Sequence, residues 1–207
     1  MTRPAAWTSA RNQQVRPWQA AASVTALSLM LLGGTPTWAQ GSSAHLSLVS
    51  VATTPKGAAD LCTRHAWACS NPKGQLRDDT RAILAAARDV NRRVNRRVRT
   101  VDDMVQYRVP DFWTLPSKRG GDCEDLALLK KLELLKRGIA ANRLLMATVY
   151  GRRVGAHAVL VLRLDDGDYV LDILNNSIKP WHRTKYTFLR IQNPKAPGTW
   201  MTVSTRG

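Results

Sequence analysis

The chain has 207 residues, of which 44% are hydrophobic, so it has room for one domain with a real core and wholesale disorder is excluded. Lysine and arginine number 31 against 15 acidic residues, and the resulting formal charge of +16 favours an anionic partner, such as nucleic acid, a membrane surface or an acidic protein. A solvated basic surface explains the same charge, and because no nucleic-acid motif is present we expect no nucleic-acid partner.

Residues 1–39 have the pattern of a signal peptide. Arginines precede the apolar stretch 20–34, no acidic residue occurs before Gln40, and "TPTWAQ" offers small residues for cleavage after Ala39. The apolar stretch is shorter than the ~20 residues that span a bilayer. We therefore expect an exported, periplasmic protein that is not integral to the membrane after cleavage. An uncleaved membrane anchor is the alternative.

Residues 40–58 are small and polar apart from one apolar patch, and we interpret them as a flexible leader before a domain at 59–207. In an oxidising compartment two of three thiols commonly pair. Cys62 and Cys69 are seven residues apart, so we predict a disulfide between them, which leaves the third cysteine free. The alternative is a metal site that includes His65, but it lacks a fourth ligand at a suitable spacing.

The first half of the domain has helical patterns. Apolar residues recur at three- and four-residue steps over about 79–99, which predicts a helix with an arginine-rich solvent face. Residues 101–121 contain prolines and glycines and are interpreted as a loop with one helical turn. A second helix is predicted over about 123–137, capped by Asp122 and stopped by Gly138. Because apolar residues cover most of its circumference, it should be central to the fold.

After Gly138 the chain changes to short segments rich in Val, Leu and Tyr, separated by turn residues. "DDGD" at 165–168 indicates a hairpin. Helices first and strands after predict an α+β fold in which an antiparallel sheet packs on the central helix. The predicted strands are "RLLMATVYG" (143–151), "GAHAVLVLRLDD" (155–166), "DYVLDILNNS" (168–177), "YTFLRIQ" (186–192) and "TWMTVS" (199–204).

Cys123, at the start of the central helix, is the candidate nucleophile. The helix dipole and the N–H groups of the first turn favour a thiolate there and can later bind an oxyanion. His157, in an apolar strand, is the candidate base, and Asp172 is the candidate orienter, because a buried carboxylate requires a partner. If 166–167 form a two-residue turn, Asp172 shares the face of His157 but lies four residues along. Asn176, directly opposite His157, then remains an alternative orienter.

Three segments together resemble the bacterial transglutaminase-like cysteine peptidases of the LapG type. The segments are "PDFWTLPSKRGGDCEDLALLKKLELLKRGI" (110–139), "AHAVLVL" (156–162) and "VLDILNNSIKPW" (170–181). They contain the W-x-x-P, G-D-C-E-D, strand-His and L-D-x-L patterns of that family, and the resemblance covers roughly 60–185. It implies a papain-like fold in its transglutaminase-like variant, with Cys123 as nucleophile, His157 as base and Asp172 as orienter. Leu126 stands where the family commonly has Tyr.

The same resemblance implies a calcium ion beside the nucleophile, and this addresses why acidic residues flank Cys123 although carboxylates oppose a thiolate. Carboxylate oxygens suit Ca²⁺, and a divalent cation reverses the local charge. Asp122 and Glu124 are the suspected ligands, and Asp125 is a weaker one. The alternative is that Asp122 caps the helix and its neighbours complement the dipole. Residues of the preceding loop could complete the shell: Asp102, Asp103 and Asp111.

The resemblance further implies a calcium-dependent endopeptidase that cuts the N-terminal region of a large surface adhesin, releases it and so disperses biofilm. The implied regulator is an inner-membrane cyclic-di-GMP receptor that sequesters the protease. Two alternatives stay open. A transglutaminase-type acyl transferase would use the same triad, because both reactions pass through an acyl-enzyme. A catalytically idle module would use the basic surface for binding.

Overall fold

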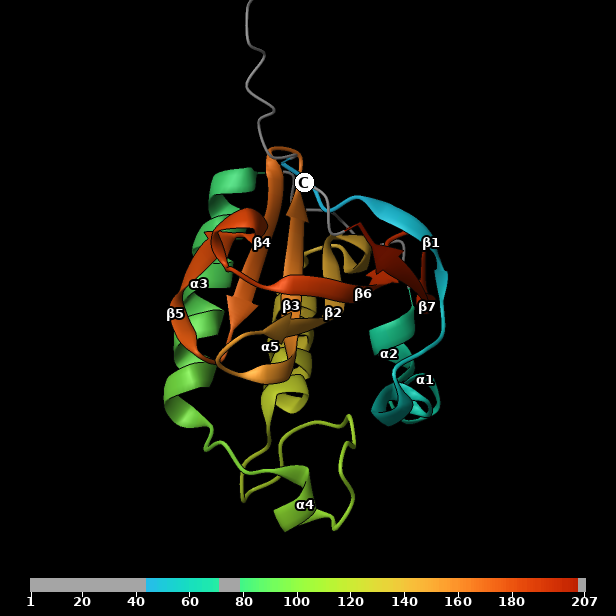
Figure 1. Ribbon diagram of the computed structural model, residues 1–207. Helices are drawn as coiled ribbons and strands as arrows, with labels where there is room; N and C mark the ends of the chain where they lie inside the picture. Colours follow the sequence, from blue (N-terminus) through green and yellow to red (C-terminus); the bar gives the residue numbers. More distant parts are fainter. Residues whose placement is uncertain (1–43, 71–78, 205–207) are drawn as a thin grey trace, which may run out of the picture. The chain divides into compact units, whose positions relative to one another are not determined.

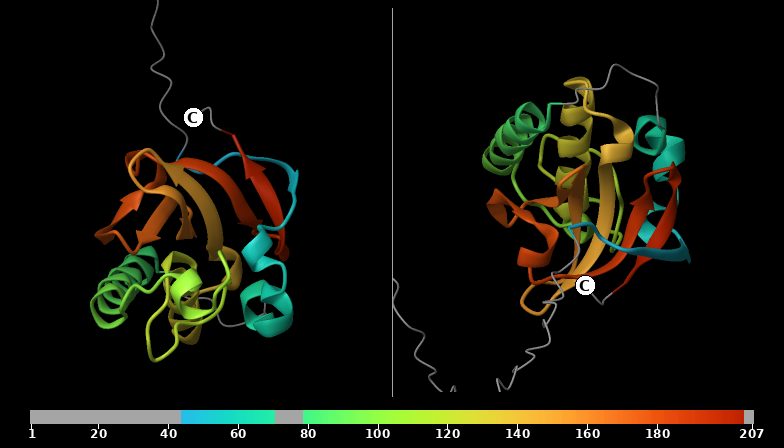
Figure 2. Two further views of the ribbon diagram at one scale, coloured as in Figure 1. Left: turned by 60° about the horizontal axis from the view of Figure 1, so that its bottom comes forward. Right: turned by 90° about the horizontal axis from the view of Figure 1, so that it is seen from above.

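The computed structural model describes residues 44–70 and 79–204 (Figure 1). Its sheet has seven strands in the order β1-β7-β6-β2-β3-β4-β5, and every pairing is antiparallel. The helices lie on one side of this sheet (Figure 2). The predicted α+β architecture, with an antiparallel sheet packed on a central helix, is confirmed. The predicted signal peptide, residues 1–39, lies outside the described residues.

Capping residues mark the start of one long helix and the end of another. Asp79 accepts hydrogen bonds from the N–H groups of Arg81 and Ala82 and so caps the long helix α3, and Gly138, with a φ of 82°, follows α5. In the described part of the chain no helix is long and apolar enough to span a membrane. The α-helices are α1 (Leu61–Arg64), α2 (Ala66–Cys69), α3 (Thr80–Arg97), α4 (Asp103–Gln106) and α5 (Cys123–Lys136). Short 3-10 turns are η1 (Lys56–Ala58), η2 (Ala141–Arg143) and η3 (Trp181–Arg183).

The strands separate two apolar layers. Leu160 and Leu162 of β3 face the layer formed with α3 and α5, and Val159 and Val161 face the other. This alternation is the two-residue period of a strand that is buried on both faces. The strands are β1 (Leu48–Ala52), β2 (Leu144–Gly151), β3 (Gly155–Leu164), β4 (Gly167–Asp172), β5 (Asn175–Pro180), β6 (Thr187–Asn193) and β7 (Ala196–Val203).

The prediction of a flexible leader is wrong for residues 44–58. Leu46 is buried, and the next segment forms β1, which pairs with β7 at the edge of the sheet. The segment "LSLVSV" (46–51) contains apolar and β-branched residues that suit a strand pairing at this edge. Residues 40–43 lie outside the described residues.

The predicted strand 168–177 is two strands. A turn follows Asp172, where the Leu174 N–H donates to Oδ1 of Asp172, and β5 begins at Asn175. An Asp that bonds a backbone N–H two residues later forms a turn of its own, and this local bond outweighs the β propensity of the residues around it.

The predicted disulfide between Cys62 and Cys69 is present and joins α1 to α2. His65, the suggested third ligand of an alternative metal site, instead forms a hydrogen bond of 3.2 Å from its Nε2 to Oγ1 of Thr114. Cys123 is the free cysteine.

Candidate active site

Two glycines bring the loop before α5 close to its neighbours. Gly120 has a φ of 124°, and a Cβ at this position would lie 2.2 Å from the carbonyl oxygen of Arg99. A Cβ on Gly121 would lie 2.5 Å from Oδ2 of Asp125. Only glycine fits at both positions, because a side chain would displace backbone or a buried carboxylate. The G-G-D-C sequence is therefore required by the close approach of the chain to its own helix start.

Cys123 is the first residue of α5, and its sulfur lies beside the start of β3. The N–H of Ala158, the residue after His157, donates to Sγ over 3.4 Å, and the thiol donates to Oε2 of Glu124 over 3.1 Å. Asp122 occupies the N-cap position, but its side chain makes no capping hydrogen bond, contrary to the predicted cap. The N–H groups of the first turn are therefore not engaged by a capping side chain.

The side chains of His157 and Asp172 are both buried, and Nε2 of the ring lies 2.9 Å from Oδ1 of the carboxylate. The register of the hairpin explains this contact. Leu164 pairs with Gly167, so the turn consists of residues 165–166 and not of 166–167, the case considered from the sequence. Continued along the hairpin, this register places Asp172 only two residues from direct pairing with His157, within diagonal contact on the same face. The carbonyl and side chain of Asn176, the alternative orienter, instead accept hydrogen bonds from α3.

Asp172 is held from several directions. Its Oδ2 accepts a hydrogen bond of 2.7 Å from the hydroxyl of Tyr186, and its backbone carbonyl accepts one of 2.9 Å from Nδ2 of Asn95 in α3. Burial raises the pKa of Asp172, but the hydrogen bonds from His157, Tyr186 and the Leu174 N–H outweigh it and hold the pKa below its ordinary value. Asp172 is therefore an anion fixed against the imidazole.

Tyr186 and Asn95 were not singled out from the sequence. Tyr186 lies in a segment that gives no catalytic signal, since a Tyr at the start of a strand is common. Asn95 belongs to a Val-Asn pair that occurs twice in α3, at 90–91 and 94–95, and an amide that recurs beside apolar residues was a usable signal. Both residues act on the side chain or backbone of Asp172 and so belong to the same hydrogen-bonded unit.

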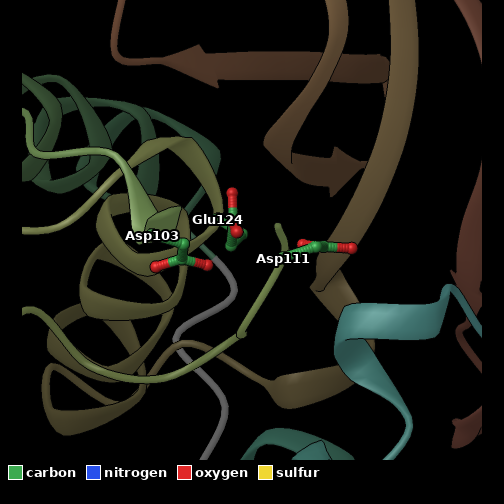
Figure 3. Close-up of side chains that lie close together, drawn as sticks. All are labelled: Asp103, Asp111 and Glu124. Atoms are coloured by element: carbon green, nitrogen blue, oxygen red, sulfur yellow. The ribbon is translucent and has the colours of Figure 1, made fainter. Parts of the chain in front are cut away.

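Carboxyl groups gather beside Cys123 in two overlapping clusters that share Asp103. One consists of Asp103, Asp111 and Glu124 (Figure 3), and the other of Asp103, Asp122 and Asp125, and within each cluster one oxygen per residue lies within 4.8 Å of the others. The two suspected ligands thus fall in different clusters, Glu124 in the first and Asp122 in the second, and Asp103 of the preceding loop belongs to both. Asp102 belongs to neither cluster and caps α4 through the Met104 N–H.

The second cluster is the better cation site. Its residues each have a buried oxygen that accepts no hydrogen bond within the described residues, namely Oδ1 of Asp103, Oδ1 of Asp122 and Oδ2 of Asp125. Asp111, in contrast, is exposed, and each of its oxygens already accepts a hydrogen bond, from Trp113 Nε1 at 2.8 Å and from the Gly57 N–H at 3.0 Å. Buried anionic oxygens without donors are costly unless a cation is bound, and these donor atoms are the hard oxygens that Ca²⁺ prefers.

The electrostatics without a metal oppose a reactive thiol. Burial raises the pKa of Cys123 far above its usual value, the charge of Glu124 raises it further, and the Ala158 N–H opposes this only in part. Burial, followed by the nearby Asp122, raises the pKa of Glu124 to about 10, and burial raises that of Asp125 to about 8. Burial is also the main reason why the pKa values of Asp103 and Asp122 are raised. The site therefore holds more negative charge than its surroundings stabilise.

The loop before α5 donates backbone hydrogen bonds to two of the clustered carboxylates. The Thr114 N–H donates to Oδ1 of Asp125 over 2.9 Å, and the Phe112 N–H donates to Oδ2 of Asp103. Trp113, between them, is buried and packs edge-on against Trp200 with ring centroids 5.7 Å apart. The W-x-x-P segment thus anchors backbone donors over the acidic groups, which fixes the carboxylates of two elements relative to Cys123.

Comparisons with known proteins identify the family of this chain and structures of similar fold. The family of bacterial transglutaminase-like cysteine proteinases matches residues 48–207. The calcium-bound structure of LapG from Legionella pneumophila is 24% identical, with a TM-score of 0.50, over 59% of this chain and 70% of that one. A further structure of the same LapG is 25% identical, with a TM-score of 0.49, over 57% of this chain and 68% of that one. No curated protein matches the chain.

Proposed function

This chain belongs to the bacterial transglutaminase-like cysteine proteinases, and from that membership we propose that it is a calcium-dependent endopeptidase whose nucleophile is Cys123, whose base is His157 and whose orienter is Asp172. The observation that supports this assignment is the buried hydrogen bond between His157 and Asp172. His157 lies beside the nucleophile, because the N–H of the following residue, Ala158, donates to the Cys123 sulfur. A thiol, an imidazole and a fixed carboxylate in this order are the components of nucleophilic acyl transfer.

In the proposed reaction, the imidazole of His157 takes the proton of the Cys123 thiol and the sulfur attacks the scissile carbonyl carbon. The resulting imidazolium is stabilised by Asp172, which also fixes the ring orientation through Nε2. His157 then returns the proton to the leaving amine as the C–N bond breaks and a thioester remains on Cys123. A water molecule, deprotonated by the same imidazole, hydrolyses the thioester and regenerates the thiol.

The oxyanion of both tetrahedral intermediates requires donors close to the sulfur. The first turn of α5 provides them, because its N–H groups point toward the N-terminal end of the helix and the Asp122 side chain does not cap them. The positive end of the helix dipole acts in the same direction. We expect these contributions to favour the thiolate as well as the transition state.

Bound calcium would supply positive charge beside the thiol and so lower the cost of forming the thiolate. Asp103, Asp122 and Asp125 would hold it through the oxygens that lack donors, and Glu124 lies between this cluster and the sulfur. The calcium-bound LapG of Legionella pneumophila, whose fold this chain shares, is consistent with a calcium site in this fold. The acidic flanks of Cys123 are then a metal site and not an obstacle to catalysis.

The substrate that we propose is the N-terminal region of a large surface adhesin, whose cleavage would release it and promote biofilm dispersal. The chain would act in the periplasm after removal of residues 1–39, and an inner-membrane cyclic-di-GMP receptor would control it. These steps are carried over from the family resemblance of the sequence. Without the three arginines of residues 1–39 the formal charge falls from +16 to +13, which is still consistent with an acidic protein substrate.

The test of the peptidase is proteolysis of a mixed peptide library by the purified protein in calcium, with cuts identified by mass spectrometry. We expect cuts from the wild type, none from Cys123→Ala, and a covalent adduct of the wild type with a thiol-directed peptide inhibitor that Cys123→Ala does not form. Cuts by the Cys123→Ala protein would refute the assignment of the nucleophile.

A labelled primary amine in the same reaction separates hydrolysis from acyl transfer, because the two outcomes differ only in what attacks the thioester. We expect free carboxylates at the cuts and little incorporated label. Incorporation that exceeds hydrolysis would identify a transferase that uses the same three residues.

A further inference from the structure

A hollow of about 520 Å³ lies between two loops at one end of the sheet. One is the turn that joins β2 to β3, and the other is the segment that joins η3 to β6. The turn contributes two arginines and a valine, and the segment contributes a threonine, a lysine and a tyrosine. The lining side chains are Arg152, Arg153, Val154, Thr184, Lys185 and Tyr186.

Tyr186 is a wall shared by this hollow and the candidate active site. Its hydroxyl donates to Oδ2 of Asp172 over 2.7 Å, and its ring lies 5.9 Å, between centroids, from the ring of His157. A peptide that passes over His157 therefore reaches the hollow directly. The segment is also ordered by its own bonds, since Oγ1 of Thr184 donates to the carbonyl of Trp181 over 2.7 Å. Preorganised walls of this kind reduce the entropy lost on binding.

The charge of the hollow is uncompensated. Arg152, Arg153 and Lys185 are exposed, and none of them forms an ion pair or a side-chain hydrogen bond with any residue that the structure describes. Like charges that converge without a counter-ion repel each other and create a field that attracts anions. Guanidinium groups bind carboxylates with two parallel hydrogen bonds. Val154 and the Tyr186 ring provide apolar surface for the stem of such a side chain.

The position of the hollow relative to His157 indicates which side of the substrate it contacts. His157 returns a proton to the leaving amine, so the residues that follow the scissile bond must run past its ring. The Tyr186 ring lies tilted beside that ring and is also a wall of the hollow. The first residues on the C-terminal side of the cut are therefore the ones that come within reach of the basic side chains.

We propose that this hollow is a substrate subsite that takes an Asp or Glu side chain from the C-terminal side of the scissile bond, with Arg152, Arg153 and Lys185 as its specificity-determining residues. The inference rests on the proposed peptidase chemistry at Cys123 and adds a substrate class to it. An acidic residue after the cut gains an ion pair that Asn or Gln lacks.

The probe is a proteome-derived peptide library digested in calcium, with the residues on both sides of every cut read by mass spectrometry. We expect Asp and Glu to be enriched over Asn and Gln by up to about fivefold at one position after the cut, the largest factor that one surface ion pair usually supplies. The triple variant Arg152→Gln/Arg153→Gln/Lys185→Gln should lose this preference and keep its turnover of neutral peptides. The matched control is Arg81→Gln/Arg88→Gln/Arg92→Gln, which removes the same charge from the exposed face of α3 and should keep the preference.

A charge reversal makes the test sharper. Arg153→Glu should favour peptides with Lys at the same position after the cut. Cuts without an acidic preference, a preference that survives in the triple variant, or one located before the cut would overturn the subsite while the peptidase stands. Absence of any cut by the wild type would overturn both. Circular dichroism and thermal unfolding of the variants exclude misfolding as the cause.

Discussion

Tyr186 and Asp172 form a hydrogen bond of 2.7 Å through the phenol and Oδ2, on the carboxylate oxygen that His157 does not use. Oδ1 accepts the His157 ring at 2.9 Å and the Leu174 N–H at 3.0 Å. The carboxylate is thus fixed by three donors from three segments, and its rotation would break at least one bond. By holding the carboxylate that bonds the His157 ring, these contacts give the imidazole a defined orientation before any substrate arrives.

Asp172→Asn should lower kcat/KM by about 10²–10⁴-fold, because the amide neither stabilises the imidazolium nor enforces the same ring tautomer. The measurement is cleavage of a quenched peptide selected from the library cuts, with KM and kcat determined separately. Asp166→Asn, in the exposed turn of the same hairpin, is the control and should retain wild-type rates. Comparable rates in the two variants would remove Asp172 from the mechanism.

Tyr186→Phe should lower kcat by about tenfold and leave KM nearly unchanged, because the ring remains and only the bond to Asp172 is lost. The free energy of unfolding should fall by about 1 kcal/mol, the usual contribution of a hydrogen bond. Steady-state kinetics and urea unfolding check the two parts. A rise in KM with unchanged kcat would instead indicate that Tyr186 acts only as a wall of the substrate site.

The sequence predicted the elements of the site better than their relative register. The turn signal at 165–168 correctly located a hairpin, but four turn-forming residues permit three positions for a two-residue turn. Only the observed pairing of Leu164 with Gly167 brings Asp172 within reach of His157. Gly167, the first residue after the turn, has a positive φ of 147°, a conformation that glycine adopts readily. The pattern of residue types alone does not decide which residue of the turn region takes that conformation.

Asp103→Asn should weaken calcium binding at least tenfold, because Asp103 belongs to both carboxyl clusters and its Oδ1 lacks a donor. Asp102→Asn, one residue earlier, is a close control, since Asp102 lies outside both clusters and Asn can keep the cap of α4. Calorimetric titration with calcium and thermal unfolding in calcium or EGTA measure the effect independently of activity. Equal affinity in both variants, or no binding by the wild type, would contradict the site.

The carboxyl clusters show why the sequence left some of the suspected ligands open. Asp122 and Glu124 adjoin Cys123 and so could be named from their position. Asp103 joins them through the fold, because α4 and the loop after it return to the start of α5, where the Phe112 N–H bonds Asp103 and the Thr114 N–H bonds Asp125. Which of three loop aspartates contacts the helix is decided by this packing, and no periodicity in the loop encodes it.

Lys130 leads to a prediction about pH. Its side chain is fully buried in α5 and Nζ has no hydrogen-bond partner within the described residues. Burial lowers the pKa to about 7 from 10.5, against the opposing effect of Asp172. Above about pH 7 the folded protein releases this proton while the unfolded chain still binds it, so the free energy of unfolding rises with pH by up to about 1.4 kcal/mol per unit. Below that pH both states are protonated and the full cost of the buried charge remains.

Lys130→Met should therefore stabilise the protein most at and below pH 7, because it removes the buried ammonium and keeps an apolar stem of similar length. Its advantage over the wild type should shrink as pH rises toward the ordinary lysine pKa, where both states of the wild type become neutral. Urea unfolding of both proteins between about pH 6 and pH 10 measures this difference. Lys136→Met, at the exposed end of the same helix, is the control and should give a small difference at every pH. A stability difference for Lys130→Met that does not change with pH would mean that Lys130 keeps the same protonation in the folded and unfolded chain.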